Sequence, residues 1–197
     1  YIAMGYTVST AGDVAGNHGE TDIWVVKFDE SGNILWQNCL GGSSSEEGYD
    51  VRETTDGGYV IVGGSQSNDG DLSSNYGSSD FWVIKLNVNG EIVWEKNYGG
   101  SNNDIARSVD LTDDGGFLIC GISSSSDGDI SSSNGARDYW VLKLDQNGNI
   151  IWEKSLGGTG NDLCYSISNT DNGGAIVAGF STSINGIISG NHGDSDF

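Results

Sequence analysis

The chain has 197 residues, with 28 acidic side chains against 8 Lys and Arg, a formal net charge of −20 at pH 7 and a pI of about 4.1. Nucleic acids and anionic membrane surfaces recruit basic patches, so neither is predicted as a partner, and no apolar run approaches the roughly 18–20 residues of a membrane-spanning helix. With 32 Gly and no Pro, chain reversals must be made by Gly, Asn and Asp, which favours an all-β protein.

The sequence repeats every 58 residues, and within one such period four segments are predicted to be strands. Residues 105–116 alternate in polarity before a Gly pair, "GGFLICGIS" at 115–123 is a short apolar run, and "RDYWVLKLD" at 137–145 is rich in aromatic and β-branched residues. The fourth, "GNIIWEKSL" at 148–156, follows a loop whose glycine suits the positive φ of a hairpin. The equivalent hairpin glycines of the three repeats are Gly32, Gly90 and Gly148.

The repeat has a period of 58 residues and runs through the whole chain. We predict a single segment, residues 1–197, with units at about 1–58, 59–116, 117–174 and a partial 175–197. Four antiparallel strands in each unit predict the blade of a β-propeller, with about three and a half blades present. Such a partial ring would be completed by other blades of a longer chain or by copies of this one. The tryptophans recur with the same period at Trp24, Trp82 and Trp140, and at Trp36, Trp94 and Trp152.

A sheet with apolar residues on both faces cannot bury them alone, so neighbouring units must cover each other. The recurring tryptophans are expected to supply much of this contact. Two recurring charged positions are interpreted structurally. The Asp before the Trp strand is expected to bond backbone amides, and the Lys within that strand to pair with a carboxylate or to extend along apolar surface. These residues are Asp22, Asp80, Asp138 and Asp196, and Lys27, Lys85 and Lys143.

The unit "DxWVxKLDxxGxIxWxKxxGG", followed by a "DGG" turn, resembles the repeat of secreted and surface-anchored β-propeller proteins of bacteria and archaea. The hairpin "VLKLDQNGNIIWEK" is more distantly similar to the repeat of quinoprotein propellers. The first resemblance covers nearly the whole chain and implies an extracellular or cell-surface propeller. It supplies no catalytic residues.

The loops before the Trp strands carry the candidate metal ligands. Closely spaced carboxylates suit a hard cation, and calcium is the natural candidate, although Asp-Gly pairs also make turns by bonding local amides. The EF-hand pattern is incomplete here, and the first and last loops keep fewer carboxylates. The candidate ligands are Asp69, Asp71 and Asp80 in one loop, and Asp127, Asp129 and Asp138 in the next.

Three further loop residues are candidates for ligand binding. Tyr76, His18 and His192 occupy the same repeat position, where Tyr76 and His192 could stack against a sugar and the two histidines could alternatively bind a metal or act as a general base. No nucleophile motif or phosphate-binding loop is found in the sequence. The cysteines Cys39, Cys120 and Cys164 form no CxxC motif and are interpreted as small apolar residues.

We therefore expect a secreted or cell-surface module that binds carbohydrate or another surface protein through polar loops that vary between the units. One alternative is a fragment of a propeller enzyme, a quinoprotein-like dehydrogenase or a hydrolase, with its catalytic residues outside this segment. Another is a purely structural spacer. The sequence contains no catalytic motif that supports the enzyme hypothesis.

Overall fold

The chain is all-β. A computed structural model describes residues 1–191 and 193–196, and within these ranges it has thirteen strands and no helix, hence no helix long and apolar enough to cross a membrane. The four segments predicted as strands correspond to β8, β9, β10 and β11, so these predictions are confirmed. In chain order the strands are β1 Ile2–Thr7, β2 Asp22–Phe28, β3 Ile34–Leu40, β4 Glu46–Glu53, β5 Tyr59–Ser65, β6 Asp80–Leu86, β7 Ile92–Tyr98, β8 Asp104–Leu111, β9 Phe117–Ser123, β10 Asp138–Leu144, β11 Ile150–Leu156, β12 Asp162–Asn169 and β13 Ala175–Ser181.

The strands form four antiparallel sheets, each made of strands that are consecutive in the chain. The sheets are β1-β2-β3, β4-β5-β6-β7, β8-β9-β10-β11 and β12-β13. They are offset from the sequence units, because the strand that ends one unit pairs with the first strand of the next unit. Strand β8, for example, pairs with β9 from Asp104 opposite Ser123 to Leu111 opposite Phe117.

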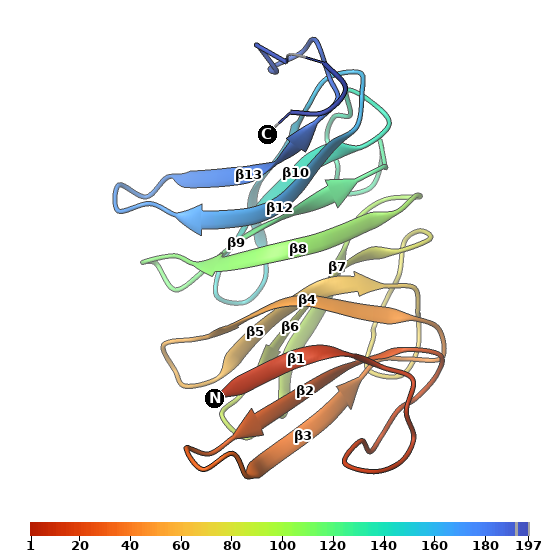
Figure 1. Cartoon of the computed structure of the whole chain (residues 1–197), viewed down its shortest axis with the longest axis vertical. Coiled ribbons are helices and arrows are strands. Elements are labelled where there is room, and N and C mark those ends of the chain that lie inside the picture. Colours follow the sequence, from red (N-terminus) through yellow and green to blue (C-terminus); the bar gives the residue numbers. More distant parts are fainter. Residues whose placement is uncertain (192, 197) are drawn as a thin grey trace.

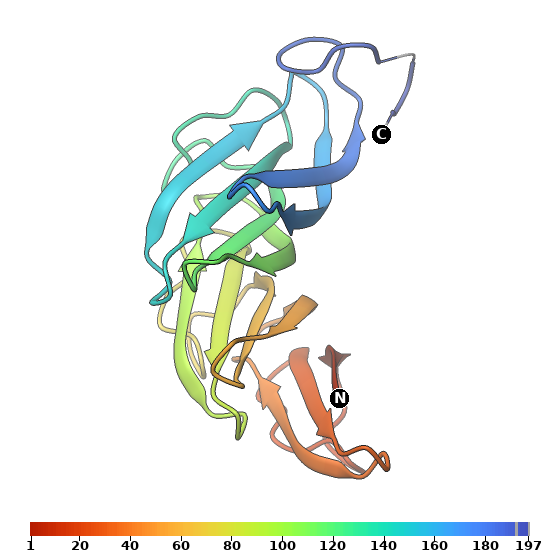
Figure 2. The same cartoon turned by 90° about the vertical axis from the view of Figure 1, so that its left-hand side faces the viewer.

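The sheets stack face to face, as Figure 1 shows, and Figure 2 shows that the stack follows a curve. Strands β4, β8 and β12 are each an edge strand of their sheet, and β4 contacts β8 and β8 contacts β12. We call the edge that these three strands form the inner edge. The middle strands are the most buried: every residue of β5, β6 and β9 is buried. A sheet that is buried on both faces needs a neighbour on each side, as the repeat predicted.

Aromatic rings join each sheet to the next. Trp140 of β10 packs edge-on against Phe81 of β6 at 4.6 Å between ring centroids, and both side chains are fully buried. The second tryptophan of the hairpin packs on the following sheet, Trp36 on Tyr59 at 5.8 Å and Trp94 on Phe117 at 5.9 Å. The prediction that tryptophans pack between sheets is confirmed at these positions.

The hairpin glycines allow this close packing. Gly90 and Gly148 have φ of +85° and +74°, values that favour glycine over other residues. A Cβ on Gly90 would lie 2.9 Å from the Trp36 ring, and one on Gly148 would lie 3.0 Å from the Trp94 ring. Each hairpin therefore covers the second tryptophan of the preceding sheet.

The recurring lysines pair with carboxylates of the preceding turn. Lys85 Nζ lies 2.9 Å from Asp56 Oδ2, and Lys143 Nζ lies 2.7 Å from Asp114 Oδ1. Lys27 instead lies over the Tyr59 ring, 5.0 Å from its centroid. Each lysine thus has a partner of the kind expected for a cation among apolar strands.

Trp140→Ala is expected to lower the free energy of unfolding by about 3–5 kcal/mol, because it leaves a cavity between two sheets. Trp152→Ala is the matched control, since Trp152 is 39% exposed and should cost only about 1 kcal/mol. Urea denaturation of both variants measures the difference. Equal losses would show that the buried ring does not hold the sheets together.

Candidate functional site

The long loops lie along one side of the stack, and the short turns lie along the other. Figure 1 shows the β1–β2 loop on the right, and the turns between β4 and β5 and between β12 and β13 on the left. Apart from His192, which lies outside the described residues, the candidate ligands named from the sequence lie in these long loops or at the first residue of the strand that follows. This side of the molecule therefore carries the described candidate residues.

The Asp-Gly-Asp residues bond the linker of the preceding sheet. Asp69 Oδ1 accepts the Ser43 amide at 2.8 Å, and Asp71 Oδ2 accepts the Gly41 amide at 3.1 Å. The next loop repeats both bonds, Asp127 with Ser101 at 2.8 Å and Asp129 with Gly99 at 3.2 Å. These carboxylates thus bond the long loop of one sheet to the linker that follows the last strand of the preceding sheet.

The Asp at the start of each Trp strand bonds the loop before it. Oδ2 of Asp80 accepts the Tyr76 amide at 2.5 Å, and that of Asp138 accepts the Asn134 amide at 2.7 Å. The expectation that these residues fix the loop is confirmed. Their other oxygens have no such partner: among the described residues, Oδ1 of Asp22, Asp80 and Asp138 is buried without a hydrogen bond.

Asp80 lies beside a second buried carboxylate, from the next sheet. Asp80 Oδ1 and Asp104 Oδ2 lie 2.4 and 2.9 Å from the point that a Cβ on Gly99 would occupy. Asp104 is fully buried and accepts bonds from the amides of Gly100 and Ser124 and the hydroxyls of Ser123 and Ser125. Gly99 is therefore required here, because any side chain would meet both carboxylates.

The same arrangement recurs at all three junctions between sheets. At the first, Asp22 and Glu46 flank Gly41, and at the third, Asp138 and Asp162 flank Gly157. A third acidic residue contacts the glycine of the first two junctions: Asp71 bonds Gly41, and Asp129 bonds Gly99. At the third junction, Ile187 occupies the equivalent sequence position.

Burial raises the pKa of Asp80 to about 6, and the charges of Asp104 and Asp129 add to this effect against the opposing amide bonds of Tyr76 and Gly77. Burial also raises the pKa of Asp129. The middle junction therefore concentrates negative charge where little water can screen it, and it favours either a proton or a cation.

The carboxylates that were predicted to bind one metal ion together lie at two different junctions. Asp71 faces the sheet before it, whereas Asp80 faces the sheet after it, together with Asp104 and Asp129. Throughout residues 1–191 and 193–196, no group of three or more His, Cys, Asp or Glu side chains is placed to hold a metal ion. The loops as described are thus arranged for bonding backbone amides, and a calcium site stays a prediction.

Of the predicted ligand-binding residues, Tyr76 is 59% exposed on the loop surface. His18 lies against Asp22, with Nδ1 2.8 Å from Asp22 Oδ2, and its side chain is 41% exposed. His192 lies outside the described residues. Tyr76 and His18 belong to loops of different sheets, so each presents a separate surface.

A small pocket on the inner edge escaped the sequence interpretation. It has a volume of about 190 Å³ and lies between the ends of β4, β5 and β8, where Glu47, Tyr49, Gln66 and Asn103 line it. Arg107 covers one face of the Tyr49 ring at 3.9 Å. Positions in this lining vary between units, and that variation was the available signal. Tyr49 corresponds to Arg107 in the next unit and to Tyr165 in the one after, and Glu47 corresponds to Ile105 and Leu163.

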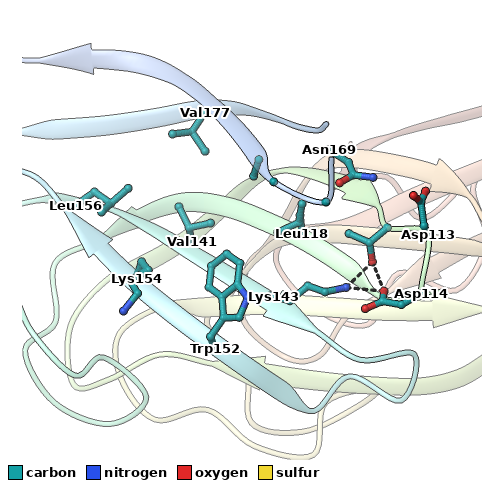
Figure 3. Close-up of a pocket in the computed structure, with 14 residues that line it drawn as sticks. Asp113, Asp114, Leu118, Val141, Lys143, Trp152, Lys154, Leu156, Asn169 and Val177 are labelled. Atoms are coloured by element: carbon teal, nitrogen blue, oxygen red, sulfur yellow. Dashed lines mark hydrogen bonds and ion pairs between the residues drawn. The ribbon is translucent and has the colours of Figure 1, made fainter. Parts of the chain in front are cut away.

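A second cleft of about 440 Å³ opens between the last two sheets (Figure 3). Its floor is apolar, with Leu118, Val141, Leu156 and Val177, and the ring of Trp152 stands at its side. Trp152 is the repeat equivalent of Trp94, which the hairpin at Gly148 covers. The cleft is thus the place where a further hairpin of the same kind would fit.

No known family model matches the chain. It is similar to the regulatory protein FlaEY of Caulobacter vibrioides, with 22% identity over 174 residues, which are 82% of this chain and 18% of FlaEY. A crystal structure of a protein of unknown function from Bacteroides caccae aligns with 89% of this chain and 65% of that chain, at 14% identity and a TM-score of 0.34. The chain thus spans only part of either protein's length.

The raised pKa of Asp80 predicts that stability falls as pH rises from 4 to 7. The folded-state pKa of about 6 exceeds the ordinary 3.8, so this group's contribution is complete below pH 3.8 and is lost as pH rises through 6. The loss is about 3 kcal/mol at most. Asp80→Asn should remove most of this slope in urea titrations, whereas the exposed Asp113→Asn should leave it unchanged. Parallel pH profiles for wild type and Asp80→Asn would contradict the assignment.

Proposed function

We propose that this chain is a segment of a β-propeller that acts as a binding module at the cell surface or outside the cell. The four-stranded repeat, the face-to-face stack and its curvature support the propeller assignment. In such a ring, the inner edge formed by β4, β8 and β12 lines the central channel. Other blades of a longer chain, or copies of this one, complete the ring.

The inner-edge pocket is the observation that carries the binding proposal. Its lining combines one carboxylate, two amides and a tyrosine, a set that suits a neutral ligand with many hydroxyl groups. Carbohydrate is therefore the ligand class we favour, and a polar loop of a surface protein is the alternative. Arg107 stacks on Tyr49, and the Tyr49 hydroxyl donates a hydrogen bond to Glu47 Oε2, so both contacts hold the ring in place beside the pocket.

The surrounding surface also fits a polar ligand. Ser79, at the end of the long loop between β5 and β6, takes part in the lining, together with Ser45 and Asn103 from the short linkers before β4 and β8. The sheets beneath are rigidly packed, so the loops vary on a fixed frame. The acidic surface of the chain disfavours anionic ligands.

The similarity to FlaEY favours a second candidate function. FlaEY is named a regulatory protein, and the similar region covers 82% of this chain. Under this proposal, the chain is one segment of a larger regulatory protein, and its inner edge binds a protein partner. Recognition of a protein through the same pocket distinguishes this candidate from carbohydrate binding.

A glycan array tests the carbohydrate proposal. We expect binding to at least one neutral glycan, and we expect Asn103→Ala to weaken it about tenfold, because one hydrogen bond to the ligand is lost. Asn161→Ala is the matched control, since Asn161 is the repeat equivalent of Asn103 and lies outside the pocket lining. Equal weakening by both variants, or an array signal no different from the blank, would remove carbohydrate as the ligand.

Calcium is the proposed stabilising ion of the acidic loops. Millimolar calcium should raise the melting temperature by roughly 5 °C if it binds the folded state with a Kd well below that concentration. The double variant Asp71→Asn/Asp129→Asn should lose this response, while the exposed Asp113→Asn keeps it. A melting temperature that neither calcium nor a chelator changes would count against the ion.

A further inference from the structure

Two cysteines that the sequence interpretation treated as separate apolar residues meet between sheets. Cys120 of β9 and Cys164 of β12 are free thiols, both 0% exposed, with their Sγ atoms 2.8 Å apart. The pair lies in a small apolar cluster with Leu118, Val141 and Ile167. Two sulfurs this close need only a small further approach to reach the roughly 2.05 Å of a disulfide bond.

The neighbouring junctions show what this position ordinarily holds. The repeat equivalents are Val62 and Ala106 at the middle junction, and Met4 and Gly48 at the first. Val62 and Ala106 share one core cluster, and a Cβ on Gly48 would lie 2.8 Å from Met4 Sδ. Each junction is filled by a complementary pair, and of these three pairs only the cysteines can be linked covalently.

We infer that Cys120 and Cys164 are a redox pair that closes a disulfide between the last two sheets. The two thiols lose two protons and two electrons, and a disulfide of a thiol–disulfide exchange partner accepts them. One cysteine thiolate attacks that disulfide and releases a thiol, and the second cysteine then attacks the mixed disulfide and releases the other. The partner is thereby reduced to two thiols.

The timing of this step follows from burial. The hydrogen bond between the thiols, together with burial, raises the pKa of Cys120, so the folded protein holds little of the thiolate that exchange requires. The bond therefore forms while β12 and β13 are still docking. Once the sheets have closed, the apolar cluster shields the disulfide from reductants.

The expected consequence is a more stable C-terminal junction. The bond would close a loop between residues that are 44 positions apart, which restricts the unfolded chain. It would also join β12 to β9 where the last sheet has two strands and buries less than the middle sheets. A disulfide of this kind persists in oxidising compartments, in keeping with the surface location proposed above.

Thiol counting on the whole chain tests the inference. After refolding in a glutathione redox buffer, the chain is denatured in acid and alkylated. We expect one alkylated cysteine, Cys39, an intact mass lower by two hydrogen atoms, and a peptide map that links Cys120 to Cys164. Reduction before alkylation should give three alkylated cysteines and lower the melting temperature by roughly 5–10 °C.

Two variants serve as controls. Cys120→Val/Cys164→Ala takes the residues of the middle junction, so it should fold and its melting temperature should not respond to reductant. Cys39→Ser should keep both the bond and the response. Three alkylated cysteines after refolding under oxidising conditions, a bond that involves Cys39, or an equal response in the Val/Ala variant would overturn the inference.

Discussion

The structure depends on the contact between neighbouring sheets. Strands β5, β6 and β9 are buried along their whole length, so the middle of each of the two sheets that contain them is covered by protein on both faces. These two middle sheets are held by a neighbour on each face, and aromatic pairs such as Phe81 with Trp140 make that contact specific. The residues that recur in the sequence are consequently those that make contacts between sheets as well as those that form each sheet.

The junctions also explain where the buried charges lie. On the side of the long loops, the chain passes from one sheet to the next through a short linker. The backbone amides of this linker face inward and need hydrogen-bond acceptors. Glu46, Asp104 and Asp162 supply them from the first residue of β4, β8 and β12. As a result, two carboxylates lie close together at each junction. The Asp that fixes the long loop approaches the linker glycine, Gly41, Gly99 or Gly157, which the acidic residue of the next sheet also approaches.

The strands and hairpin turns could be predicted because a 58-residue period and a glycine at a fixed place are local signals. The partners of Asp71 and Asp80 could not, because each bonds or faces a different neighbouring sheet, and adjacency along the chain suggested one shared site. The contact between Cys120 and Cys164 was hidden for the same reason. Their offset of 44 residues reflects which strands meet across a junction and matches no multiple of the period.

The constancy of the junctions gives the variation elsewhere its meaning. Residues that hold sheets together recur from unit to unit, as Gly41, Gly99 and Gly157 do. On the inner edge, one repeat position holds Arg107 in place of the tyrosine of Tyr49 and Tyr165, and another holds Glu47, Ile105 and Leu163. None of the first three side chains is buried: Tyr165 is 46% exposed, and Tyr49 and Arg107 are half-buried and contact each other. A frame that repeats while one exposed edge diverges is suited to recognising an asymmetric ligand along that edge.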